Sequence, residues 1–183
     1  MRQRHFMVAA TMVALLVAGA ALAQSKEDKD RAAIKASSQE SLQTLFTTVP
    51  TSKALYDKAA GYAVFATTKA GFIVTGGGGS GIAVDKAADK TVFMKMGMGG
   101  VGLGIGAQKY DMIILFETAT RLQAFLDGGW DSAAAAKAVA GSDSAAVSQD
   151  FVEGSIIYTV GEKGLMASAD LSGARFWVDE DLN

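Results

Sequence analysis

The sequence predicts an α+β fold in which N-terminal helices pack on a glycine-rich, mainly antiparallel sheet that is strongly curved or barrel-like. Three observations support this class. Helical periodicity is concentrated before residue 60, short β-leaning runs separated by Gly- and Asp-containing turns begin at Tyr62, and glycine alternates with apolar residues over residues 100–107. No internal repeat, low-complexity linker or second domain interrupts the chain.

The first 23 residues have the pattern of an export signal. A basic start with Arg2 and Arg4 leads into an uncharged apolar run that ends in the small residues Ala21–Ala23. We predict a cleavable signal peptide over residues 1–23 and a single domain over residues 24–183, located in the periplasm. An uncleaved membrane anchor is the alternative. No cysteine follows the apolar run, so a lipoprotein is not expected.

The start of the predicted domain, residues 24–60, forms its helical part. Residues 25–49 are rich in helix formers and carry one apolar stripe at helical spacing, which comprises Ile34, Leu42, Leu45, Phe46 and Val49. Pro50 ends this helix and can open a second one over "TSKALYDKAAG".

Residues 61–183 are predicted to form the sheet part. Strand-like runs are "YAVFATT", "GFIV", "GIAV", "TVFMKM", "MIILF", "SIIYTV", "GLMASADL" and "GARFWVD", and "TATRLQAFLDGG" has a helical pattern. The continuous apolar run "MIILF" is typical of a strand that is buried on both faces. Residues 130–147 are ambiguous between helix and strand. Met94, Met96 and Met98 share one strand face, where they fill a core or line an adaptable apolar pocket.

Composition excludes several common kinds of catalysis. The chain has no cysteine, and its one histidine, His5, lies in the predicted signal. Ser–His–Asp hydrolysis, cysteine nucleophiles and His- or Cys-liganded zinc are therefore not expected, and neither is a cofactor. A carboxylate enzyme using Asp111, Glu117, Asp170 and Asp179 remains as an alternative, but each acid is explained more simply as a turn or surface residue. We predict a non-enzymatic protein.

Charge argues against nucleic acid as a partner. Without Arg2 and Arg4, 15 basic residues face 19 acidic ones, so the net charge of the predicted domain is −4. Affinity for a phosphate backbone rests on a basic surface, which a mildly acidic domain lacks.

The glycine-rich stretches do not predict a nucleotide site. "GGGGSG" matches the dinucleotide pattern, but a short strand rather than a helix follows it, and Ile82 and Ala83 stand where a P-loop needs Lys and Ser or Thr. We interpret residues 75–81 as a bulged strand or tight turn. The alternating Gly100, Gly102, Gly104 and Gly106 indicate tight packing in a small curved sheet or barrel, with close approach of a ligand as the alternative.

Several blocks in the right order carry a family resemblance. "YDKAAGYAVF" with "KAGF" (Lys69–Phe72), "GVGLGIGAQKYDMIILF" and "EKGLMASADLSGARFWVDEDLN" resemble the SYLF domain, a lipid-binding family of bacteria and eukaryotes. The resemblance covers residues 55–183. It implies a non-enzymatic module that binds phospholipid or a membrane surface, here in the bacterial cell envelope.

The resemblance also suggests where lipid binds. The resemblance implies that, as in eukaryotic members, an amphipathic N-terminal helix contributes to membrane contact, and the matching segment is Lys26–Val49. Two further lysines flank the glycine-rich strands inside the matched blocks, although single lysines are often solvated strand ends. The candidate lipid-binding residues are Lys26, Lys29, Arg31, Lys35, Lys69 and Lys109.

A protein-binding role is the alternative function. In it, the domain is an interaction or assembly module of the periplasm that has no direct lipid ligand and binds an envelope protein. Trp130 and Trp177 could then be exposed contact residues, whereas our preferred interpretation places both in the core.

Overall fold

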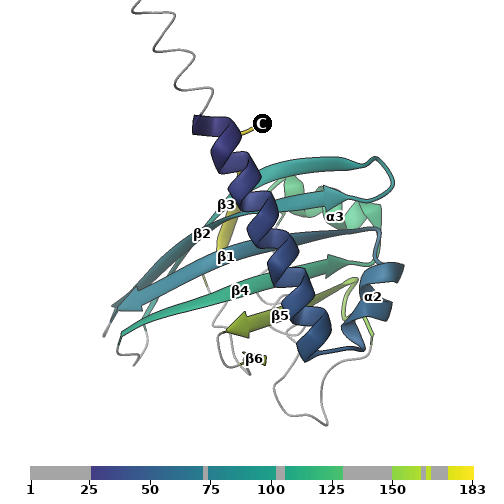
Figure 1. The fold of residues 1–183 in the computed structure, drawn as a ribbon, viewed down its shortest axis with the longest axis horizontal. Helices are drawn as coiled ribbons and strands as arrows, with labels where there is room; N and C mark the ends of the chain where they lie inside the picture. The colour runs from purple at the N-terminus through teal and green to yellow at the C-terminus, as the bar shows by residue number, and fades with distance from the viewer. Residues whose placement is uncertain (1–25, 72–73, 102–105, 130–149, 162–163, 166–172) are drawn as a thin grey trace, which may run out of the picture.

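A long helix and an antiparallel sheet dominate the structure. The computed structural model describes residues 26–71, 74–101, 106–129, 150–161, 164–165 and 173–183 (Figure 1). A helix over residues 26–48, called here the N-terminal helix, is followed by α2 (Ser52–Lys58), and α3 (Ala119–Leu126) lies between β4 and β5. The strands are β1 (Gly61–Gly71), β2 (Val74–Asp85), β3 (Lys90–Val101), β4 (Gly106–Phe116), β5 (Ser155–Gly161), β6 (Gly164–Leu165) and β7 (Arg175–Val178).

The sheet is open, so the prediction of a strongly curved or barrel-like sheet is wrong. Its seven strands run in the order β6-β5-β4-β1-β2-β3-β7, and every pairing is antiparallel. The four central strands have 11 or 12 residues, whereas the described edge strands β6 and β7 have two and four. Closure requires the two edges to pair with each other, and in the described residues they do not.

One face of the sheet is covered by the N-terminal helix and α2, as Figure 1 shows. The stripe predicted from the sequence supplies the contact, because Leu42, Leu45 and Val49 are buried against this face. The other members of this cluster come from α2 and from β1, β4 and β5: Leu55, Ala59, Val64, Ile113, Leu115, Ile156, Tyr158 and Val160.

The opposite face packs against α3. Leu122 and Phe125 of α3 are buried in a cluster that includes Phe65 and Phe176. The three methionines of β3 point to this side and are also buried, so their role is core filling. The run "MIILF" is buried on both faces as predicted, with no residue more than 3% exposed.

Alternate glycines of β2 let the backbone of β1 come close. A Cβ atom on Gly77, Gly79 or Gly81 would lie less than 3.0 Å from a carbonyl oxygen of β1. Residues 75–81 nevertheless keep an unbroken register with β1, so they form neither a bulge nor a turn. These glycines are thus explained by strand–strand approach.

Tyr158 carries a buried hydroxyl without a hydrogen-bond partner among the described residues. Its side chain is fully buried, and burial raises the pKa of the phenol to about 12. An unsatisfied buried hydroxyl costs about 1–3 kcal/mol. Tyr158→Phe is therefore expected to raise the free energy of unfolding by about 1 kcal/mol in urea titrations.

Tyr110 provides the control for Tyr158. Its hydroxyl donates a hydrogen bond to Met98 Sδ at 3.3 Å, so Tyr110→Phe removes an interaction that the native state makes. We expect this substitution to destabilise the protein. A loss of stability in Tyr158→Phe as large as that in Tyr110→Phe would contradict the assignment.

The predicted signal peptide and residues 130–147 lie outside the described residues. The division into a signal over residues 1–23 and a domain over 24–183 therefore stays a prediction. No helix in the described part of the chain is long and apolar enough to cross a membrane.

Candidate functional site

Among the described residues, nothing covers the helix-side face of the sheet where the long strands run beyond the N-terminal helix. Strand register aligns two rows of residues across β4, β1, β2 and β3 in this region, and the first row continues onto β7. We call these two rows the shelf. The first row is Lys109, Thr68, Gly78, Gly97 and Arg175, and the second is Ala107, Ala70, Gly76 and Gly99.

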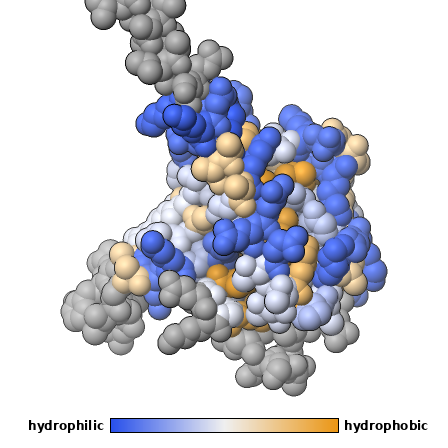
Figure 2. Space-filling model, viewed as in Figure 1, coloured by the Kyte–Doolittle hydropathy of each residue, from blue (hydrophilic) through white to orange (hydrophobic). Residues whose placement is uncertain are grey.

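The shelf is exposed because its side chains are small. Thr68, Ala70 and Ala107 are exposed, as are Gly76 and Gly99. In Figure 2 the surface beside the helix is pale, which fits residues that are neither strongly hydrophilic nor strongly hydrophobic. This part of the sheet therefore offers its own backbone and methyl groups to whatever approaches it.

Two of these glycines are not required by the protein's own packing. A Cβ on Gly76 or Gly99 would meet no atom within 4 Å, and neither residue has a positive φ. Glycine in a strand costs about 0.5–1 kcal/mol relative to alanine. These two positions differ in this respect from Gly77, Gly79 and Gly81 on the opposite face.

Trp177 lies at the β7 edge of this face. It is 48% exposed, so the interpretation that placed it in the core is wrong for this residue. On the alternating strand β7, Phe176 takes the inward position, and the ring of Trp177 reaches over Gly97, where a Cβ would lie 3.1 Å from its Cη2 atom. Trp130 lies outside the described residues.

The four predicted cations of the N-terminal helix are spread over different environments. Lys26 and Lys29 are exposed. The guanidinium of Arg31 is already engaged, because it donates to Asp28 Oδ1 and to the Leu182 carbonyl, both at 2.9 Å. Lys35 Nζ lies 5.6 Å from the centroid of the Phe93 ring.

The two predicted strand lysines lie on opposite faces. Lys109 pairs with Thr68, whereas Lys69 pairs with Gln108, so the register turns their side chains to opposite sides of the sheet. The structure therefore brings Lys109 to the shelf and Lys69 to the other face. The prediction missed Arg175, which lies at the far end of the same row and could have been found from the alternation in "RFWV".

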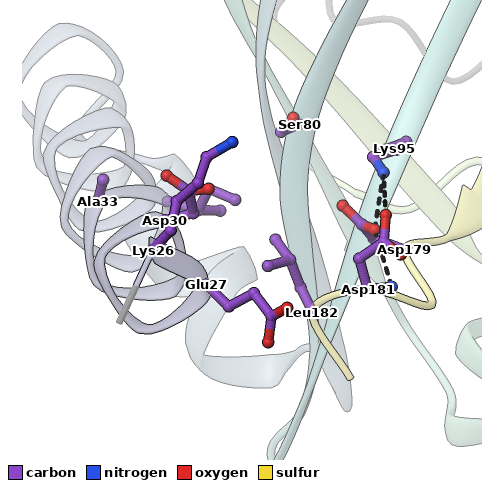
Figure 3. Close-up of a pocket in the computed structure, with 10 residues that line it drawn as sticks. Lys26, Glu27, Asp30, Ala33, Ser80, Lys95, Asp179, Asp181 and Leu182 are labelled. Atoms are coloured by element: carbon purple, nitrogen blue, oxygen red, sulfur yellow. Dashed lines mark hydrogen bonds and ion pairs between the residues drawn. The ribbon is translucent and has the colours of Figure 1, made fainter. Parts of the chain in front are cut away.

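A pocket of about 560 Å³ lies between the N-terminal helix, β2, β3 and the C-terminal residues (Figure 3). Lys95 projects from β3 toward it and pairs with Asp179 at 2.7 Å and Asp181 at 3.6 Å. The hydrogen bond from Lys95 to Asp179 raises the pKa of the lysine. The helix adds Lys26, Glu27 and Asp30 to the lining. The charged residues that line the pocket are therefore predominantly acidic.

Asp111 lies in the next row beside the shelf, under the N-terminal helix. It pairs across the strands with Ala66 and accepts a hydrogen bond of 2.8 Å from the Ser41 hydroxyl. Burial raises the pKa of its carboxyl, and the bond from Ser41 partly offsets this. Two strands separate Asp111 from Lys95 and its partner Asp179, so these two acids do not form a carboxylate pair.

Comparisons with known proteins agree with the resemblance in the sequence. The family model described as "Ysc84: Las17-binding protein actin regulator" matches residues 97–183. "Beta cell expansion factor A" of Aeromonas veronii is 40% identical over 152 residues, which are 83% of this chain and 58% of that protein. "SH3 domain-containing YSC84-like protein 1" of Homo sapiens is 38% identical over 76 residues, 39% of this chain and 22% of that protein. The chain thus spans about half the length of the bacterial relative and less of the human one.

The fold is that of an α+β domain with an exposed sheet face. The chain belongs to the SYLF (Ysc84) family, which is a family of binding domains rather than a known enzyme class.

Proposed function

We propose that this protein is a phospholipid-binding, membrane-surface module of the bacterial cell envelope, exported to the periplasm. The observation that carries the proposal is the exposed shelf. An uncovered sheet face with small side chains, cations at both edges of one row and an exposed tryptophan nearby fits a layer of lipid headgroups. Membership of a family of binding domains supports a role in binding.

Vesicle co-sedimentation tests this function. The protein for the assay is residues 24–183, which contain every helix and strand that the structure describes, so the apolar residues 1–23 cannot contribute. We expect it to sediment with vesicles that contain phosphatidylglycerol. Absence of binding to both anionic and zwitterionic vesicles would overturn the proposal.

A protein-binding or assembly module of the periplasm is the second candidate. The specific observation in its favour is the description of the matching family model, which names a Las17-binding protein and actin regulator. Cross-linking in envelope extracts tests it. A stoichiometric protein partner, together with no vesicle binding, would favour this candidate over the first.

A further inference from the structure

We infer that the shelf, and not the N-terminal helix, is the surface that contacts the membrane, and that it selects anionic lipid surfaces through Lys109 and Arg175 with Trp177 at the interface. This inference rests on the proposed function. It names the contact surface, the residues that form it and the charge of the lipid layer it prefers.

The spacing of the two cations favours a surface over a single small ligand. Lys109 on β4 and Arg175 on β7 end the same row and are separated by four strand-to-strand steps. At about 4.8 Å per step, their backbones lie about 19 Å apart. The oxygens of one phosphate group are much closer together than this, so a backbone separation of this size suits two separate headgroups better than one.

Both cations are available. Among the described residues, neither Lys109 nor Arg175 forms an ion pair or hydrogen bond, and both side chains are exposed. The two rows of the shelf contain no carboxylate. Within these two rows, an anionic layer therefore meets positive charge only.

The floor between the cations allows close approach. Gly76 and Gly99 have open space at the Cβ position, so neither internal packing nor backbone conformation accounts for glycine there. Close approach of another molecule is a usual reason for glycine inside a strand. With no protruding side chains, a planar layer can come near the sheet along the whole row.

Trp177 adds the apolar component. Among the described residues, it and Val178 are the exposed large hydrophobic side chains. Tryptophan is enriched where water meets the acyl region, because its ring is apolar and its indole N–H is polar. Its position beside Arg175 on β7 places it where headgroups would meet the shelf.

The N-terminal helix offers an anionic layer much less net positive charge than the shelf does. Lys26, Lys29 and Arg31 alternate with Glu27, Asp28 and Asp30, so the local charge is balanced. Arg31 is also held by ion pairs within the helix. Attraction to an anionic surface depends on net positive charge. The two rows of the shelf contain cations and no acid, whereas these helix cations lie among three acids.

The test compares two charge-removing double variants of residues 24–183. Lys109→Gln with Arg175→Gln removes the shelf cations, and Lys26→Gln with Lys29→Gln removes two exposed helix lysines as a matched control. On vesicles of phosphatidylglycerol and phosphatidylcholine, the shelf variant is expected to lose about five-fold in affinity per cation, about twenty-five-fold for both. The helix variant is expected to lose less than two-fold.

Two further readouts report on the contact surface itself. Gly76→Glu places a bulky acid on the shelf floor in open space, so it should abolish binding without lowering the melting temperature. In a Trp130→Phe background, fluorescence of Trp177 should shift to the blue and be quenched by brominated lipid.

The outcomes separate the inference from the function on which it rests. If the unmodified domain binds no vesicle, the proposed function fails. If it binds and the helix variant loses affinity while the shelf variant and Gly76→Glu do not, lipid binding stands and the shelf is the wrong surface. Unchanged Trp177 fluorescence on bound vesicles would likewise overturn the inference.

Discussion

Gly81→Ala is expected to lower the free energy of unfolding by about 3 kcal/mol, whereas Gly76→Ala should leave it unchanged or raise it by up to about 1 kcal/mol. The two glycines belong to the same strand, β2, but face opposite sides of the sheet. A Cβ on Gly81 would lie less than 3.0 Å from the Val64 carbonyl oxygen and 2.6 Å from Cδ1 of Phe65, both in the closely packed β1. A Cβ on Gly76 meets nothing within 4 Å.

Urea unfolding followed by circular dichroism measures both changes. Phe65 is fully buried and cannot move aside without disturbing the core that faces α3, so the strain at residue 81 must separate β1 from β2. Gly76→Ala serves as the matched control, because it adds the same methyl group to the same strand. Equal losses at the two positions would show that glycine is needed on both faces for the same internal reason.

Local sequence patterns predict which residues of a strand share a face and which runs are buried. The alternation in "TVFMKM" predicts that Met94, Met96 and Met98 share a face, and the apolar run at residues 112–116 predicts a strand buried on both sides. The structure confirms the continuous burial of that run. Period and composition act locally, so these features can be predicted without knowing the partners of each strand.

Whether the sheet is open or closed depends on which strands pair with each other. Local sequence patterns do not reveal these pairings. Glycine alternation fits a barrel corner as well as an open sheet in which β1 approaches β2 closely. The difference lies in the strand order and in the short edges β6 and β7, which long-range pairing determines. The close approach of β1 to Gly77, Gly79 and Gly81 does not require closure. The tight packing expected at Gly100, Gly102, Gly104 and Gly106 stays a prediction, since residues 102–105 lie outside the described residues.

The candidate site was predictable only in part for the same reason. Lys69 and Lys109 occur in equivalent positions beside glycine-rich runs, and both were predicted as lipid contacts. A register offset of one residue places Lys69 opposite Gln108, and a shift of one residue reverses the face of a side chain. Arg175 joins Lys109 because β7 pairs with β3, a contact between segments about 80 residues apart.

Leu45→Ala is expected to lower the free energy of unfolding by about 3 kcal/mol, within the range of about 2–5 kcal/mol for buried leucines. Leu45 is fully buried between the N-terminal helix and the sheet, in the cluster that contains Val64, Ile113 and Tyr158. Its truncation leaves a cavity at this contact. Gln43→Ala, at an exposed position two residues earlier in the helix, is the control and should change stability by less than about 0.5 kcal/mol.

Leu45→Ala also distinguishes two modes of membrane binding, one through the shelf with the helix in place and one through a helix released from the sheet. Loss of the Leu45 contact makes detachment of the helix from the sheet easier, because it weakens the packing that holds them together. If the shelf binds the lipid layer, vesicle affinity of folded Leu45→Ala should equal that of the unmodified domain, since the shelf lies outside this contact. A helix that must leave the sheet to reach the membrane would instead bind more tightly in the variant, by up to the factor that the lost stability represents. Measuring affinity well below the unfolding transition therefore decides between a fixed sheet surface and a released helix.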